Sequence, residues 1–254
     1  MYDYNFIENK LVEFLRKETR RIGIQKAVIG LSGGIDSAVS AFLTVKALGN
    51  ENVLSVLMPY KTSSKESVTD AQLVVDALNI RSKTIEITTM VDSFIAKIND
   101  EQMSSVRKGN IMARVRMITL YDQSAFEKAI VVGTGNRTEI LLGYTTLFGD
   151  SACAINPLGC LFKTQVFELA KHLGVPESII LKKPTADLWA GQTDEGEMGL
   201  TYAEVDKYLY LKFDENKSKD ELMKLGYSIE YINKVDGMIE KNRFKSLPPV
   251  VPEL

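Results

Sequence analysis

Two adjacent glycines and three oxygen-bearing side chains lie together near the start of the chain, in the string Gly30-Leu-Ser-Gly-Gly-Ile-Asp-Ser37. Glycine at positions 33 and 34 lets the backbone turn sharply and leaves its N–H groups open to a ligand. The apolar run Ala27–Leu31 precedes the turn, and apolar residues at helical spacing follow from Ala38, so we expect a helix to begin just after Ser37. Backbone N–H groups and a helix dipole then converge on one point, which predicts an anion-binding turn.

The type of anion follows from what accompanies the turn. The sequence contains no lysine-bearing G-x-x-x-x-G-K-[ST] loop and no G-x-G-x-x-G dinucleotide fingerprint. Asp36 instead places a carboxylate beside the expected anion, which is favourable only when a divalent cation bridges the two. The string resembles the pyrophosphate loop of the ATP pyrophosphatases, which hold ATP while a substrate oxygen is adenylated. The alternative is an ordinary Gly-Gly turn with a serine cap.

A second carboxylate and a lysine follow later in the chain. Glu139 lies in the string Gly133-Thr-Gly-Asn-Arg-Thr-Glu139, after a buried strand and in the first turn of the next helix. Taken alone it stabilises a helix dipole, but together with Asp36 it could complete a magnesium site on ATP. Lys163 opposes the dipole of the helix that it begins, so we expect a fixed anionic partner for it; the alternative is a solvated lysine.

Alternating strands and helices are expected to position these groups. Short apolar runs predict strands at Ala27–Leu31, Asn52–Met58, Lys83–Ile87 and Ala129–Val132, with helices between them and a long helix at Gly109–Phe126. This alternation predicts an α/β fold, a doubly wound parallel sheet of Rossmann-like type flanked by helices. Because ligands bind at the carboxyl ends of such strands, the loops after the first and fourth strands should face one crevice.

Composition limits the class of protein. The chain has 254 residues, 45% of them hydrophobic, and a net charge of −2, so no global charge favours a nucleic-acid or membrane partner. We see no signal peptide and no apolar run of the ~20 residues that a membrane span needs. Cys153 and Cys160 are too few for a disulfide framework and wrongly spaced for a C-x-x-C metal site. We therefore expect a cytoplasmic protein with reduced thiols.

The expected organisation is one domain over residues 1–254, with a core sheet at about 22–180, a lid loop at about 182–200 and C-terminal helices at 201–254. The lid mixes polar residues and glycines with the only tryptophan of the chain. Such a composition is typical of a mobile segment that closes over a substrate and excludes water.

With these motifs in order, the chain resembles the ammonia-dependent NAD synthetases from its first helix to its Pro-Pro tail. The resemblance rests on the turn at 30–37, Asn110–Met117, Gly133–Glu139, Asn156-Pro157, Lys163, Pro184–Leu188 and Gly191–Glu195. It implies a homodimer that binds ATP, Mg²⁺, deamido-NAD and ammonia, adenylates the nicotinate carboxylate, and releases NAD, AMP and pyrophosphate.

The resemblance also implies roles for particular residues. Asp36 and Glu139 would hold magnesium, and Asp36, Lys163 and the lid residue Asp194 would be catalytic. Contacts to ATP would come from Gly30, Leu31, Ser32, Gly33, Gly34, Ile35, Asp36, Ser37, Thr134, Lys163 and Thr185. Contacts to deamido-NAD would come from Arg114 and Lys245, although Arg114 could also be a surface salt-bridge residue. The apolar residues Ile111, Val115, Ile118 and Leu120 are either a subunit contact or core.

The chain departs from larger bacterial members at three positions. Leu147 and Ala154 stand where many members carry Lys and Asp, and Phe244-Lys245 replaces a His-Lys pair. A glutamine-using synthetase needs a further domain, for which 254 residues leave no room, so we expect free ammonia as the nitrogen donor. The alternatives are another adenylating enzyme of GMP-synthetase or tRNA-thiolating type, and a nucleotide-binding module that senses ATP or AMP without turnover.

Overall fold

The order of the strands places a topological switch point beside the first strand. The computed structural model describes residues 3–185, 187 and 191–252. Its parallel sheet has the order β3-β2-β1-β4, formed by β1 (Ala27–Gly30), β2 (Val53–Leu57), β3 (Arg81–Thr84) and β4 (Ile130–Val132). The chain therefore runs outward from β1 to β3 and then returns to pair β4 on the other side of β1. This confirms the predicted doubly wound α/β sheet.

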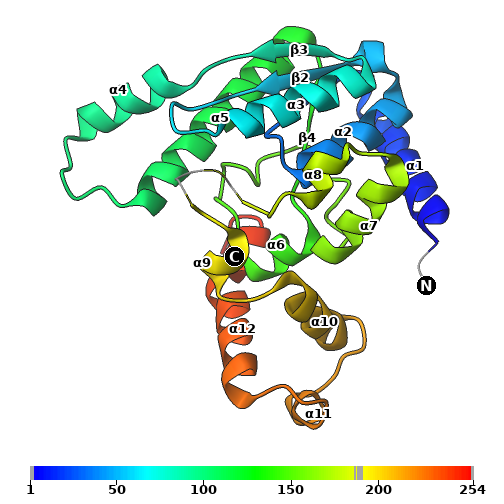
Figure 1. Ribbon diagram of the computed structural model, residues 1–254, viewed down its shortest axis with the longest axis vertical. Helices are drawn as coiled ribbons and strands as arrows, with labels where there is room; N and C mark the ends of the chain where they lie inside the picture. Colours follow the sequence, from blue (N-terminus) through cyan, green and yellow to red (C-terminus); the bar gives the residue numbers. More distant parts are fainter. Residues whose placement is uncertain (1–2, 186, 188–190, 253–254) are drawn as a thin grey trace.

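Helices cover both faces of this sheet and continue beyond it (Figure 1). The helices are α1 (Tyr4–Ile22), α2 (Ile35–Leu48), α3 (Lys65–Leu78), α4 (Thr88–Ile98), α5 (Ser105–Glu127), α6 (Arg137–Leu142), α7 (Lys163–Leu173), α8 (Glu177–Leu181), α9 (Asp194–Met198), α10 (Tyr202–Phe213), α11 (Lys219–Lys224) and α12 (Ile229–Asn242), with short 3₁₀ turns η1 (Asn50–Asn52) and η2 (Arg243–Ser246).

Residues along β1 alternate between two apolar cores. Ala27 and Ile29 pack into a core shared with α1, α2, α3 and α7, whereas Val28 packs into a second core shared with α4 and α5. All three are at most 1% exposed, so the strand is buried on both faces, as a continuous apolar run predicts. The two cores hold the carboxyl ends of β1 and β4 rigidly, and these ends carry the predicted site residues.

The C-terminal helices form a third apolar cluster of their own. Figure 1 shows α10, α11 and α12 gathered away from the sheet, with Tyr208 of α10 fully buried among them. Asp206 of α10 connects this cluster to the sheet-covering helices, because its carboxylate accepts hydrogen bonds from Thr138 Oγ1 of α6 and from the Thr164 backbone N–H of α7.

Several predicted boundaries differ from the structure, among them the start of α5 at Ser105 rather than Gly109, and two of them change how the elements are interpreted. Helix α2 begins at Ile35 rather than after Ser37, because Gly34 adopts an extended conformation and serves as its N-cap. Asp36 therefore lies inside the first turn. The third strand is Arg81–Thr84 rather than Lys83–Ile87, although Ile85 and Ile87 still donate backbone hydrogen bonds to Leu57 and Pro59. All four residues of β3 are exposed, because it is an edge strand. The apolar pattern that predicted a strand comes from Ile85 and Ile87, which follow β3 and are less exposed.

The predicted lid is only partly a loop. It contains the short helix α9, and Ala186 and residues 188–190 lie outside the described residues. Its beginning is anchored to α3, since Lys182 Nζ lies 2.9 Å from Asp70 Oδ2 and the Ser64 N–H donates to Asp187 Oδ2 over 3.0 Å. In the part of the chain that the structure describes, no helix is both long and apolar enough to cross a membrane.

Gly33 marks the closest contact between the turn after β1 and α3. It has a φ of +77°, and a Cβ atom at this position would lie 2.1 Å from the Ser67 carbonyl oxygen. Only glycine combines this left-handed conformation with so close a backbone approach. Gly174 at the end of α7 has almost the same φ, +76°, but nothing lies within 4 Å of its added Cβ.

We predict that Gly33→Ala lowers the free energy of unfolding by roughly 3 kcal/mol or more, since it adds a backbone clash to the cost of about 1–2 kcal/mol for a left-handed alanine. Gly174→Ala is the matched control, because it should lower the free energy of unfolding only by the cost of a left-handed alanine. Urea denaturation of the two variants measures the difference. Equal losses would show that Ser67 moves aside freely and would contradict the prediction.

Candidate active site

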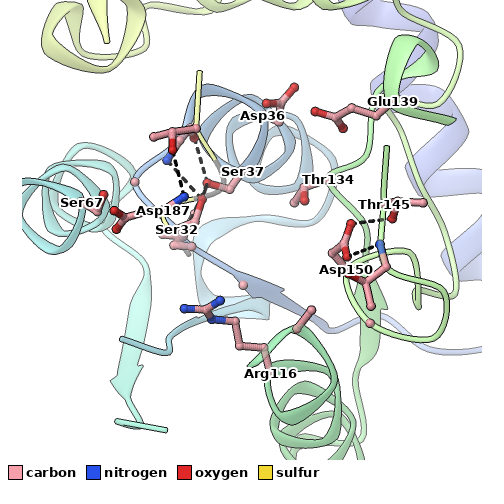
Figure 2. Close-up of a pocket in the computed structure, with 18 of the residues that line it drawn as sticks. Ser32, Asp36, Ser37, Ser67, Arg116, Thr134, Glu139, Thr145, Asp150 and Asp187 are labelled. Carbon is pink, nitrogen blue, oxygen red and sulfur yellow. Dashed lines mark hydrogen bonds between the residues drawn. The ribbon is translucent and has the colours of Figure 1, made fainter. Parts of the chain in front are cut away.

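A cavity of about 490 Å³ opens at the switch point between β1 and β4. Its walls include the turn after β1, the loop after β4, the first turn of α3, the inner side of α5 and the beginning of the lid. The sequence predicted that the loops after the first and fourth strands face one crevice, and this is confirmed. Figure 2 shows the polar side chains of both loops directed into this space.

Two serines shape the turn after β1. Ser37 Oγ donates a hydrogen bond to the Gly34 carbonyl over 2.9 Å and accepts one from the Ser32 backbone N–H over 3.3 Å. Ser32 Oγ accepts a third hydrogen bond, from the Gly34 backbone N–H over 3.2 Å. Gly34, the N-cap of α2, offers no side-chain cap, so the helix start keeps its N–H groups open on the cavity side. This is the geometry of an anion-binding helix start.

A buried lysine connects the two predicted metal carboxylates. Lys163, only 2% exposed, forms an ion pair with Asp36 through a short contact, and its Nζ lies 3.6 Å from Glu139 Oε1. Asn136 Nδ2 donates to Asp36 Oδ1 over 3.0 Å, so the loop after β4 also holds this carboxylate. In Figure 2 the carboxylates of Asp36 and Glu139 point toward each other. The fixed anionic partner expected for Lys163 is therefore present.

Each of these three groups is placed by the first turn of a helix. Asp36 belongs to α2, Lys163 is the first residue of α7, and Glu139 completes a capping box with Asn136 at the start of α6. A lysine at a helix start is electrostatically unfavourable by itself. Here the two carboxylates compensate for it, and the Lys163 N–H donates to Thr138 Oγ1 over 3.0 Å.

Burial and charge shift the pKa values in this cluster. Burial and the nearby Asp36 charge raise the pKa of Glu139 to about 8, against the attraction of Lys163. Burial alone would lower the pKa of Lys163, but Asp36 and Glu139 together raise it above its ordinary value. Lys163 is therefore held in its charged form, whereas burial and the Asp36 charge favour the protonated form of Glu139 more than they would for an exposed glutamate.

Asp194 at the start of α9 faces the same cluster. Its carboxylate accepts a hydrogen bond of 3.1 Å from Tyr202 OH, and Tyr144 OH lies 3.4 Å from its other oxygen. Burial is the main cause that raises the pKa of Asp194, while Lys163 and the Tyr202 hydrogen bond oppose it. A carboxylate of raised pKa beside a cavity is a candidate proton acceptor.

With one exception, the residues that the sequence predicted for the site line this cavity. They are Gly30, Leu31, Ser32, Gly33, Gly34, Ile35, Asp36, Ser37, Thr134, Glu139, Lys163, Thr185, Asp194 and Lys245. Lys245 Nζ donates to the carbonyls of Gly143 and Thr145, at 2.7 and 3.0 Å. The exception is Arg114, which is exposed and donates from Nε and Nη2 to the Leu147 carbonyl.

Two positions at which the chain departs from larger members also lie off the cavity wall. Neither Leu147 nor Ala154 lines it, and their backbones form internal hydrogen bonds, Leu147 with Arg114 and Ala154 with Val131. Sequence reasoning missed Asp206, Tyr144 and Arg116. Asp206 and Tyr144 belong to no local sequence motif. Arg116 lies in the motif Asn110–Met117, two residues after Arg114, and its place in that motif was the only feature of the sequence that could have identified it.

Comparison with known proteins agrees with this geometry. The NAD synthase family model matches residues 7–249. The NH₃-dependent NAD⁺ synthetase of Fusobacterium nucleatum is 49% identical over 248 residues, which covers 98% of this chain and 95% of that protein. The corresponding protein of Chlorobaculum tepidum is 49% identical over 253 residues, 100% of this chain and 91% of that one.

Solved structures give the same picture. The NMN synthetase of Francisella tularensis superposes with a TM-score of 0.89 at 36% identity, and the NH₃-dependent NAD synthetase of Campylobacter jejuni with a TM-score of 0.84 at 36% identity, each covering 100% of both chains. With its pyrophosphate-loop turn, its two facing carboxylates and these full-length relatives, the chain belongs to the NAD synthase family.

Proposed function

We propose that this chain catalyses the ATP-dependent amidation of deamido-NAD with ammonia, which yields NAD, AMP and pyrophosphate. The observation that carries the proposal is the convergence of an open helix start with Lys163, Asp36 and Glu139 on a single cavity. The full-length NH₃-dependent relatives support the substrate assignment. The chain is a ligase that forms a C–N bond.

The first step needs positioning and charge neutralisation rather than a protein nucleophile. The triphosphate lies against the N–H groups of the turn at 32–37, beside the Lys163 ammonium. An oxygen of the nicotinate carboxylate attacks the α-phosphorus, the bond from that phosphorus to the bridging oxygen breaks, and pyrophosphate leaves. Thr134 and Thr185 also line the cavity, and we expect both to contact the nucleotide.

Asp36 and Glu139 fit the needs of a magnesium ion. Asp36 and Glu139, which face each other beside the phosphate turn, would hold the ion through their carboxylate oxygens, the ligand type that Mg²⁺ prefers. Among the described residues no cluster of three or more His, Cys, Asp or Glu forms a self-sufficient metal cage, so this site depends on the nucleotide. When bound there, Mg²⁺ neutralises charge on the phosphates of ATP.

The second step requires a proton acceptor. Ammonia attacks the carbonyl carbon of the adenylated carboxylate, the bond to the AMP oxygen breaks, and the nitrogen gives up one proton. Asp194 is suited to take that proton, because it lies in the cavity wall, is oriented by Tyr202, and has a pKa raised chiefly by burial. The charges of both Lys163 and Asp36 act on this carboxylate.

The family also contains a second candidate function. The Francisella tularensis structure is named as an NMN synthetase, which indicates amidation of a mononucleotide rather than a dinucleotide. The resemblance implies that the Lys and Asp of larger members contact the dinucleotide, and this chain has Leu147 and Ala154 at those two positions. The closer sequence agreement with NAD synthetases favours deamido-NAD as the preferred acceptor.

We further propose that the chain is a cytoplasmic homodimer with α5 at the subunit contact. Of the four apolar residues considered for such a contact, Ile111, Val115 and Leu120 pack against the core, whereas Ile118 is 60% exposed. Tyr121, 40% exposed and one turn further along the same helix, adds to this exposed apolar surface. The free thiols of Cys153 and Cys160 suit a reducing compartment.

A coupled assay of the purified protein tests the reaction itself. With ATP, Mg²⁺, ammonium and deamido-NAD, we expect NAD and AMP to appear together in equal amounts. Glutamine in place of ammonium should give far lower rates, and nicotinate mononucleotide should give a lower kcat/KM than deamido-NAD. ADP in place of AMP would refute the pyrophosphatase mechanism, and a preference for the mononucleotide would establish the second candidate function.

Removing either proposed magnesium carboxylate should abolish most activity. We predict that Asp36→Asn and Glu139→Gln each lower kcat/KM by about 100-fold or more and raise the Mg²⁺ concentration for half-maximal rate. Asp76→Asn on α3, whose carboxylate accepts a hydrogen bond from Gln72, is the exposed control. Unchanged ATP binding and an unchanged Mg²⁺ requirement in both variants would favour a non-catalytic nucleotide-binding module.

Charge on the outer surface of α5 should separate the subunits. We predict that Ile118→Glu shifts the sedimentation mass from that of a dimer to the 28.3 kDa of a single chain. Phe6→Glu on α1, where Phe6 is 59% exposed, is the control for a charge placed on an exposed apolar residue elsewhere. A wild-type protein that already sediments as a single chain would contradict the dimer proposal.

A further inference from the structure

Arg116 is a cation of the cavity wall that the reaction scheme above does not use. It lies on α5 and lines the cavity, and its hydrogen bond within the described part of the chain runs from Nε to the Met58 carbonyl, at 3.1 Å. None of the carboxylates in that part lies at ion-pair distance from it. The two terminal nitrogens, Nη1 and Nη2, therefore have no hydrogen-bond partner among the described residues.

The hydrogen bond to Met58 fixes how the side chain lies. Met58 directly follows β2, and the Nε donor anchors the guanidinium against the end of that strand. In Figure 2 Arg116 extends away from α5 across the base of the cavity, with its terminal nitrogens at the end remote from the helix. These nitrogens form a planar fork, the geometry that binds phosphate and carboxylate oxygens in pairs.

The surroundings leave the charge of Arg116 incompletely balanced. Burial is the main influence that lowers its pKa, and the attraction of Asp187 and Asp150 opposes it. A guanidinium nevertheless keeps its proton in proteins. The other two arginines of α5 differ, because Arg107 is paired with Asp100 at the surface and Arg114 donates two hydrogen bonds to the Leu147 carbonyl.

We propose that Arg116 is an oxyanion-binding residue, whose terminal nitrogens bind a phosphate or carboxylate oxygen of a nucleotide in the cavity. This inference rests on the proposed function for the identity of those nucleotides. Both substrates carry such oxygens: ATP in its triphosphate, and deamido-NAD in its pyrophosphate and its pyridine carboxylate. A half-buried cation whose two terminal nitrogens have no partner among the described residues gains more from such an oxygen than from the flat face of a base.

Calorimetric binding to four ligands tests this role without requiring turnover. Arg116→Met removes the charge and the donors while keeping a long apolar side chain, and Arg116→Lys keeps the charge but loses the planar fork. The ligands are ATP and adenosine, which differ in phosphate, and deamido-NAD and NAD, which differ in the pyridine carboxylate. Arg107→Met, on the exposed side of the same helix, is the matched control.

The pattern of losses identifies the oxygen that is bound. If Arg116 holds the triphosphate, Arg116→Met weakens ATP about tenfold or more and leaves adenosine unchanged. If it holds the carboxylate, deamido-NAD weakens by a similar factor while NAD does not. If it holds the pyrophosphate of the dinucleotide, deamido-NAD and NAD weaken equally and ATP stays unchanged. Arg116→Lys should fall between wild type and Arg116→Met in each case.

Two results would overturn the proposal. Unchanged affinities for all four ligands would show that Arg116 has only a structural role against Met58. Equal weakening of adenosine and ATP would show that the guanidinium stacks on the base instead. A wild-type protein that binds ATP but neither dinucleotide would refute the proposed acceptor while leaving the ATP and adenosine comparison valid. Should Arg116→Met fail to fold, Arg116→Lys carries the same comparison.

Discussion

A lysine ammonium buried between two carboxylates is the interaction on which the rest of the site depends. Removing these three charges from water is costly, and the cost is recovered only when the charges are close and their remaining hydrogen-bonding groups are satisfied. Lys163, Asp36 and Glu139 come from the starts of three different helices, α7, α2 and α6. The three helix starts must therefore meet at one point, and that point is the switch point of the sheet.

Residues outside the charged cluster enforce this meeting. Asp206 of α10 accepts hydrogen bonds from α6 and from the start of α7, so a helix of the C-terminal cluster fixes the spacing between Glu139 and Lys163. Asn136 bridges from the loop after β4 to Asp36. The C-terminal helices are thus more than a cover for the sheet, because they supply the buried carboxylate that aligns two of the three helix starts.

The parts of the site that are local in sequence were predictable, and the parts made by distant contacts were not. The turn at 30–37 and the segment that carries Glu139 each follow an apolar strand directly. The succession of strand, glycine and carboxylate therefore predicted a ligand site at both places. Asp206 acts across about 40 residues on Thr164, and nothing near it in the sequence marks that role. The start of α2 was misplaced because a glycine N-cap leaves no side-chain signal. Arg116 and Arg114 are the same residue type in the same motif, and only their positions around α5 decide that Arg116 lines the cavity while Arg114 is exposed.

The start of α3 connects the phosphate turn to the lid. The carbonyl of Ser67 packs so tightly against Gly33 that no side chain fits there, while Ser67 Oγ accepts a hydrogen bond from Lys182 at the beginning of the lid. Asp70, one turn further along α3, forms the ion pair with the same lysine. The same helix start therefore contacts the phosphate turn on one side and the beginning of the lid on the other. Close packing of this kind leaves little room for one contact to change without the other. A glycine is required at position 33 because of its left-handed φ and the close approach of the Ser67 carbonyl, even though the phosphate itself needs only open backbone N–H groups. One helix start thus sets both the shape of the phosphate turn and the anchor of the lid.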